Sequence, residues 1–508
     1  MTNKKKIGLF FGAGAEMGYG LPSGGKFALD IFKMPKQEDK DYFSKMINKI
    51  DLQSQIATSN WLPADFKDKR LFVFGKGNFE DIISSSLENR RNAILSFFDN
   101  FDSNVSHMLA NWDIGEQDVQ QSFIKKTGLG FGEKLYSQVA VLNDKFAKHS
   151  SIFSSEYFSA FLKLIEMFPK ETNRISIIST CFLEFLIGSL GEDLVSDLNQ
   201  QLFKKTPPKI EIFDNLANPF SLNYSATGQN GLAIVLDEND EETVKTTDTT
   251  MTIFNKLAKD ILSNLYAQNL DYQSLIDSHF RYLYKPSSEW AKFTRISIFL
   301  YSVRRYIISQ LGDVEEIKTQ SGFYQDTNDI AEKCDIKAVG TTNYNNLISD
   351  ILKQRSTIYK LNGSVDDFYD PYKNTIVPAS KKDDYEGILV PLMFTQSGTK
   401  PLTSISMLRR YVDLYDNLKD CDEIEVIGFG FNGDDGHING LFRSLIEDKD
   451  KVVYIFQHSA GTTPKSQRDY TECYQRKLRL SSSKNLKIDF IDDNRFVNGE
   501  IWYKSILD

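Results

Sequence analysis

Four short segments place glycine, hydroxyl and amide groups directly after a short apolar run. They are Gly12-Ala-Gly14, Gly340-Thr-Thr-Asn343, Leu361-Asn-Gly-Ser364 and Gly428-Phe-Gly-Phe-Asn-Gly-Asp-Asp-Gly-His437. Glycines let the backbone approach a pyrophosphate while helix N–H groups point at its charge, and amides can hold ribose hydroxyls or a water. Because all four segments follow predicted strands, one shared nucleotide-binding cleft is favoured over four independent turns.

Each segment taken alone also has a purely structural interpretation. Gly12-Ala-Gly14 is equally typical of a plain turn, and Met17 stands where the dinucleotide fingerprint GxGxxG needs its third glycine. Asn343 is also typical of a turn residue that caps a helix. His437, the one histidine within a segment, and the pair Asp434 and Asp435 could contact a ribose or merely open a helix.

Composition narrows the classes of partner. The chain has 508 residues, with 69 acidic against 60 basic side chains and a net charge of −9. That balance gives no whole-chain attraction to nucleic acid or to anionic lipid, so neither is indicated as a partner. The most apolar stretch, Ile175–Gly191, is shorter than a bilayer crossing and contains Glu184, which predicts a buried helix. No export signal is visible at the N-terminus, so a cytoplasmic location is expected.

Cysteine and histidine are scarce. The four cysteines lie far apart, in no CxxC or Cys/His pattern, so neither a zinc clamp nor a disulfide framework is predicted and no metal is expected. Five histidines in the whole chain sharply limit the candidates for an imidazole base.

The elements that must position these segments follow from periodicity. A buried strand over Ile7–Gly12 precedes a helix that ends near Phe32, with Ser23 as a candidate N-cap, and residues 40–330 are mainly amphipathic helix. Two polar stretches interrupt the helical part, and Pro207–Tyr224 could hold a short strand or two. Further strands are predicted at Ile336–Val339, Thr357–Leu361, Ile388–Val390, Ile424–Ile427, Val452–Phe456 and Ile488–Ile491.

Strands that alternate with helices predict an α/β fold with one doubly wound parallel sheet. We expect residues 1–35 and 335–508 to form this Rossmann-like core in two parts. Residues 36–334 would be a large, mainly helical insertion that serves assembly or regulation.

The order of the motifs resembles the SIR2-like proteins of bacterial anti-phage defence. The resemblance is carried by Gly12-Ala-Gly14 with Gly20-Leu-Pro22, then Thr341-Thr-Asn-Tyr344, Leu361-Asn-Gly-Ser364 and Gly428-Phe-Gly-Phe-Asn-Gly-Asp-Asp-Gly-His437. It covers roughly residues 1–35 and 335–460. It implies a Rossmann-like fold that binds NAD and breaks the nicotinamide–ribose bond, so that phage-infected cells lose their NAD.

The resemblance also assigns residues. Gly12, Ala13 and Gly14 would contact the phosphates, Asn343 the nicotinamide ribose, and Gly428 and Gly430 the adenosine half. The remaining expected nucleotide-binding residues are Glu16, Pro22, Thr341, Thr342, Gly363, Ser364, Asn432 and Asp435. The expected catalytic residues are Asn343, His437 and Asn362.

One position departs from the family. Relatives usually have histidine as the base where this chain has Asn362, and an asparagine can position water but cannot take up a proton near neutral pH. Cleavage of an N-glycosidic bond passes through an oxocarbenium-like state, so positioning can do much of the work, and His437 could substitute as the base.

Two functions follow. The first is an NAD hydrolase that depletes NAD in phage defence. The alternative is a module with weak or no catalytic activity that senses NAD or ADP-ribose and regulates a partner. A homo-oligomer or a complex with another defence protein is expected for either. Peptide deacylation is disfavoured, because deacylating sirtuins carry a four-cysteine zinc module.

Overall fold

The computed structural model describes residues 4–21, 24–109, 112, 115–132, 151–190, 209–210, 222–223, 228–236, 249–312, 314–353, 357–393, 404–458 and 467–507. The chain divides into two compact units. The core unit comprises Met1–Phe27, Met34–Phe74 and Ile276–Asp508, and the helical unit comprises Ala28–Lys33 and Gly75–Leu275.

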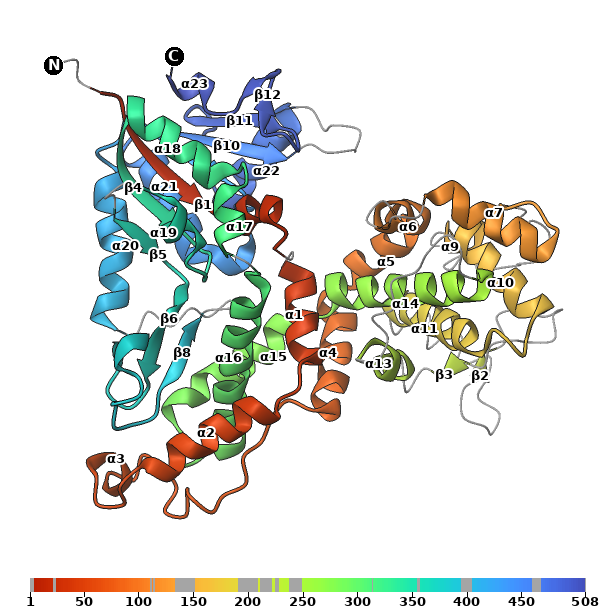
Figure 1. Cartoon of the computed structure of the whole chain (residues 1–508), viewed down its shortest axis with the longest axis horizontal. Helices are drawn as coiled ribbons and strands as arrows, with labels where there is room; N and C mark the ends of the chain where they lie inside the picture. The colour runs from red at the N-terminus through yellow and green to blue at the C-terminus, as the bar shows by residue number, and fades with distance from the viewer. Residues whose placement is uncertain are drawn as a thin grey trace. The chain divides into compact units, whose positions relative to one another are not determined.

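A six-stranded parallel sheet forms the centre of the core unit (Figure 1). Its strands are β1 (Lys6–Phe11), β4 (Asp335–Thr341), β5 (Ile358–Lys360), β9 (Glu423–Ile427), β10 (Val452–His458) and β11 (Leu486–Ile491). They lie in the order β11-β10-β9-β1-β4-β5. Counted along the chain this is 6-5-4-1-2-3, the strand order of doubly wound dinucleotide-binding sheets, and the order reverses between β1 and β9. The predicted α/β class with a parallel sheet is confirmed.

Helices cover both faces of this sheet. On one face the ring of Phe10 packs edge-on against Phe442 of α21 (Gly436–Glu447), at 5.0 Å between centroids. α20 (Ile405–Leu418) lies over the same face, since Leu414 approaches Gly340 there. On the other face Phe11 packs at 5.2 Å against Tyr324 of α18 (Phe323–Lys333), beside α19 (Leu347–Ile351). Burial on both faces explains why β1 has no polar side chain from Ile7 to Phe11.

One predicted strand does not belong to this sheet. The run Ile388–Val390 was expected in the parallel sheet, but β8 (Val390–Met393) pairs antiparallel with β6 (Gly363–Asp370), which also pairs with β7 (Thr375–Pro378). The prediction was wrong because β8 follows the pairing of β6, and only two residues separate β6 from β5. A connection this short cannot carry a crossover helix, so the chain starts a second, antiparallel sheet instead.

The core unit also contains helices from the segment that we expected to be inserted. They are α2 (Gln37–Lys49), α3 (Gln55–Thr58), the 3-10 turn η3 (Arg281–Tyr284), α16 (Trp290–Gln310), α17 (Val314–Thr319) and α18. α16 packs on β8 and on α2. Residues 34–74 and 276–334 therefore belong to the core unit, so the separate unit is narrower than 36–334. The C-terminal part adds α22 (Gln467–Leu478), β12 (Phe496–Val497), β13 (Glu500–Ile501) and α23 (Lys504–Leu507).

The helical unit is built mainly of helices, as the periodicity predicted. They are α4 (Lys76–Asn89), α5 (Arg91–Asp99), α6 (Phe101–Leu109), α7 (Glu116–Thr127), α9 (Ser151–Ser154), α10 (Glu156–Met167), α11 (Asn173–Leu190), α13 (Gln229–Val235) and α14 (Thr250–Asn269). Two short strands, β2 (Lys209–Ile210) and β3 (Leu222–Asn223), pair within the stretch where a strand or two was expected. α1 (Gly24–Lys33) and α15 (Tyr272–Phe280) contribute residues to both units.

The predicted buried helix over Ile175–Gly191 is α11. It is long and apolar enough to cross a membrane by length and composition alone, but 67% of it is buried inside the protein. Packing within the helical unit therefore explains why this helix is rich in apolar residues.

Candidate functional site

The four segments singled out in the sequence follow four neighbouring strands. Gly428 follows β9, Gly12 follows β1, Thr342 follows β4, and Leu361 follows β5. Since these strands are adjacent and parallel, their carboxyl ends meet at one edge of the sheet, at the position where the strand order reverses. The structure thus brings the four segments together.

The first and fourth segments cross backbone to backbone. The N–H of Gly12 donates to the Ile427 carbonyl and that of Gly14 to the Gly428 carbonyl, both at 2.9 Å. A Cβ on Gly12 would lie 2.5 Å from the Gly428 oxygen, and one on Gly428, whose φ is +66°, would overlap the Ala15 amide nitrogen. The glycines are thus required by this crossing. A phosphate at the turn would have to use other N–H groups of the loop, since those of Gly12 and Gly14 already have acceptors.

Behind this crossing lies a buried hydrogen-bonded cluster. The Asn343 side chain is 5% exposed, and its Nδ2 lies 3.1 Å from both the Gly12 carbonyl and the Tyr324 hydroxyl. The Tyr324 hydroxyl donates to Oε1 of Glu16 at 2.7 Å, and Nδ2 of Asn345 donates to Oε2 at 2.7 Å. Glu16 belongs to the 3-10 helix η1 (Ala13–Tyr19) that opens after Gly12.

Burial dominates the electrostatics of this cluster. It raises the pKa of the Glu16 carboxyl above its ordinary value, although the hydrogen bonds from Tyr324 and Asn345 work in the opposite direction. Burial also lowers the pKa of Lys360, whose Nζ donates to the Asn345 carbonyl at 2.8 Å. The positive charge of Lys360 partly offsets the raised pKa of Glu16. The site therefore holds a carboxyl and an amine whose pKa values are shifted towards each other.

The backbone of the second segment is held by its own hydroxyl. Thr341 donates from Oγ1 to the Phe11 carbonyl at 3.0 Å and accepts there from the N–H of Asn343 at 3.0 Å. The N–H of Thr342 donates to the same carbonyl at 3.1 Å. This arrangement fixes the turn from which the Asn343 side chain projects.

Tyr411 contacts both His437 and Leu361, the residue before Asn362. The Tyr411 hydroxyl of α20 donates to the Leu361 carbonyl at 2.8 Å, and its ring centroid lies 5.5 Å from that of His437. Asn362 is 5% exposed, and its Oδ1 has no hydrogen-bond partner within the described part of the chain. The negative charge of Asp435 adds to burial in raising the pKa of the Tyr411 hydroxyl. The third and fourth segments are thus close neighbours, and Oδ1 of Asn362 is a buried acceptor that could receive a hydrogen bond from a ligand.

The other predicted residues have mainly structural contacts. Gly363 has a φ of +85°, and a Cβ there would overlap the Leu392 carbonyl oxygen. Ser364 donates from Oγ to Asp367 at 3.0 Å, and the Gly430 carbonyl accepts from Lys477 at 2.6 Å. Ala13 and Asn432 are exposed, and Pro22 and Ser23 lie outside the described residues.

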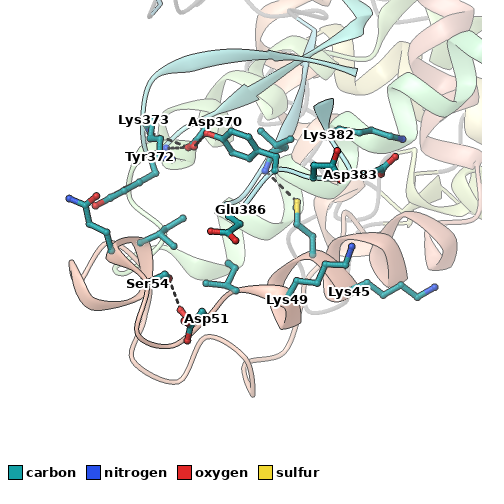
Figure 2. A pocket seen from close by; sticks show the side chains of 18 of the residues that line it. Lys45, Lys49, Asp51, Ser54, Asp370, Tyr372, Lys373, Lys382, Asp383 and Glu386 are labelled. Carbon is teal, nitrogen blue, oxygen red and sulfur yellow. Dashed lines mark hydrogen bonds between the residues drawn. The ribbon is translucent and has the colours of Figure 1, made fainter. Parts of the chain in front are cut away.

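A cavity of about 590 Å³ lies elsewhere in the core unit, beside α2, α3 and the segment between β7 and β8 (Figure 2). Figure 2 shows lysines such as Lys45 and Lys382 and acids such as Asp383 and Glu386 around it, so charge selects no class of ligand. The Asp370 carboxylate accepts from the Tyr385 hydroxyl at 2.6 Å. No described residue of the four segments lines this cavity.

Sequence reasoning did not single out Tyr324, Asn345 or Lys360. Asn345 lies two residues after the second segment, and Lys360 directly precedes the third. Tyr324 lies in a helix whose sequence has no signal for the site. No family model matches the chain, and no curated protein matches it.

Proposed function

We propose that this chain is a SIR2-like NAD hydrolase that binds NAD at the carboxyl ends of β9, β1, β4 and β5 and depletes NAD in anti-phage defence. The observation that carries the proposal is the meeting of four glycine- and amide-bearing segments where the strand order reverses. Open α/β sheets bind dinucleotides at this position.

The residues fit such a ligand. NAD carries several ribose hydroxyls, each a hydrogen-bond donor, and Asn362 offers a buried oxygen without a donor in the described part of the chain. The crossing holds the loops after β1 and β9 together, and doubly wound sheets bind the pyrophosphate of a dinucleotide at this position. The amide of Asn343 projects from the neighbouring turn.

The proposed chemistry needs positioning more than a strong base. Water attacks C1′ of the nicotinamide ribose, the glycosidic C–N bond breaks, and nicotinamide leaves as a neutral molecule with the electrons of that bond. The products are nicotinamide, ADP-ribose and one proton. The leaving group needs no proton, so holding the ribose and the water near an oxocarbenium-like state is the main task. We assign it to Asn343, with Asn362 and His437 beside the attacking water.

A second function is favoured by one residue. Asn362 has no group that can accept a proton near neutral pH, at the position where the resembling proteins have histidine. A module that binds NAD or ADP-ribose and regulates a partner, without hydrolysing NAD, would keep every contact described above.

Mass spectrometry of nicotinamide released from NAD by the purified protein, with and without phage lysate, tests the proposal. Asn343→Ala should lower the rate by about 10²-fold, the loss expected for a positioning group. Asn485→Ala is a matched control, because Asn485 directly precedes β11 at the opposite edge of the sheet and should leave the rate unchanged. Binding of NAD without any nicotinamide would favour the sensor, and absence of binding would refute both functions.

A further inference from the structure

The orientation of the Asn343 amide is determined by its neighbours. Its Nδ2 lies 3.1 Å from the Gly12 carbonyl oxygen, which can only accept a hydrogen bond. The atom that faces this carbonyl must therefore be the nitrogen. The second N–H of the amide is directed at the Tyr324 hydroxyl, again at 3.1 Å. With both N–H groups used inside the protein, Oδ1 is the atom that the amide can offer to a ligand.

Tyr324 is held so that its hydroxyl can accept from Asn343. A phenol has one proton, and that of Tyr324 is donated to Oε1 of Glu16 at 2.7 Å. The ring is fully buried and stacks on Tyr19 at 5.5 Å between centroids. Its backbone N–H donates to the Tyr19 hydroxyl at 3.0 Å. Packing therefore fixes the place of the phenol, and Glu16 fixes the direction of its proton.

Glu16 is itself anchored from a second side. Asn345 donates to Oε2 at 2.7 Å, so each carboxyl oxygen has its own donor. Glu16 is 5% exposed and cannot turn towards solvent without losing both bonds. A continuous series of hydrogen bonds thus runs from Asn345 through Glu16 and Tyr324 to Asn343.

We propose that Glu16 and Tyr324 are positioning residues that hold the Asn343 amide with Oδ1 towards the nucleotide, as an acceptor for a ribose hydroxyl or the attacking water. This inference rests on the proposed function. It narrows the recognised group to a hydrogen-bond donor. Neither Glu16 nor Tyr324 needs to touch the substrate.

A double-mutant cycle tests whether Tyr324 acts through Asn343. Tyr324→Phe removes only the hydroxyl and should lower kcat for NAD hydrolysis by about 3- to 10-fold, the effect of one lost hydrogen bond, with KM little changed. In the Asn343→Ala background the same change should have no further effect, because the group to be positioned is gone. Tyr157→Phe is the matched control, because the hydroxyl of this buried tyrosine also donates to a glutamate, Oε1 of Glu116, at 2.8 Å, but in the helical unit. It should leave kcat within about 2-fold of wild type. An equal loss from Tyr324→Phe in both backgrounds would overturn the proposal.

Crystal structures of wild type, Tyr324→Phe and Tyr157→Phe separate this inference from the proposed function. We expect Oδ1 of Asn343 to leave its wild-type position in Tyr324→Phe and to keep it in Tyr157→Phe. If Asn343 is unmoved in Tyr324→Phe, the positioning role is refuted, whatever the activity. If wild type releases no nicotinamide but Asn343 turns as expected, the hydrolase fails and the positioning role stands.

Discussion

Replacement of Gly428 by alanine should destabilise the core unit, because two independent features of the structure forbid a side chain there. The φ of +66° lies in the left-handed region, which costs roughly 1–2 kcal/mol for a residue with a Cβ. The new methyl group would also overlap the Ala15 amide nitrogen in the neighbouring loop. Overpacking of this kind typically costs about 1–3 kcal/mol.

Together these terms predict a loss of about 2–5 kcal/mol in the free energy of unfolding for Gly428→Ala. At roughly 2 °C per kcal/mol for a large unit, the melting temperature should fall by about 4–10 °C in differential scanning calorimetry. Gly433→Ala is the matched control, since a Cβ there meets nothing within 4 Å, and it should change stability by less than about 0.5 kcal/mol. Equal melting temperatures for the two variants would refute the backbone crossing as the reason for this glycine.

Three further variants probe the core unit. Glu425 is fully buried, and within the described part of the chain neither carboxyl oxygen has a hydrogen-bond partner, so burial raises its pKa. The free-energy cost of burying this carboxyl grows as pH rises above the ordinary glutamate pKa. Glu425→Gln should therefore raise the melting temperature more at pH 8 than at pH 5. An equal gain at both pH values would contradict this. Asn362→His should speed nicotinamide release if a base is what the site lacks, and an unchanged rate would exclude that. Gly14→Asp should abolish the thermal stabilisation by ADP-ribose, whereas Gly18→Asp, with open space around it, should preserve it; equal responses would place the nucleotide elsewhere.

Much of the core could be predicted because its strands have unusual sequences. β1 has no polar side chain from Ile7 to Phe11, a pattern that is typical of a strand buried on both faces of a parallel sheet, and Gly12 follows it directly. The assignment of Ile388–Val390 to that sheet failed because a short apolar run does not reveal its pairing partner. The partner of β8 is β6, whose polar sequence Gly363–Asp370 gave no strand signal.

The candidate site could be predicted only where it follows strands. Glycine and asparagine at strand ends are visible in the sequence, so Gly12, Asn343 and Gly428 were found. Tyr324 was not, because one tyrosine in an amphipathic helix is indistinguishable from a core residue until the fold places it beside Asn343. Likewise, the extent of the helical unit depends on which helices pack on β8, which periodicity does not show.

A crystal structure of the protein with ADP-ribose tests the central claim most directly. We predict that the pyrophosphate lies at the loops after β1 and β9 and that a ribose hydroxyl donates to Oδ1 of Asn343. Density for ADP-ribose in the cavity lined by Tyr42 and Tyr385, with the strand ends empty, would contradict the claim.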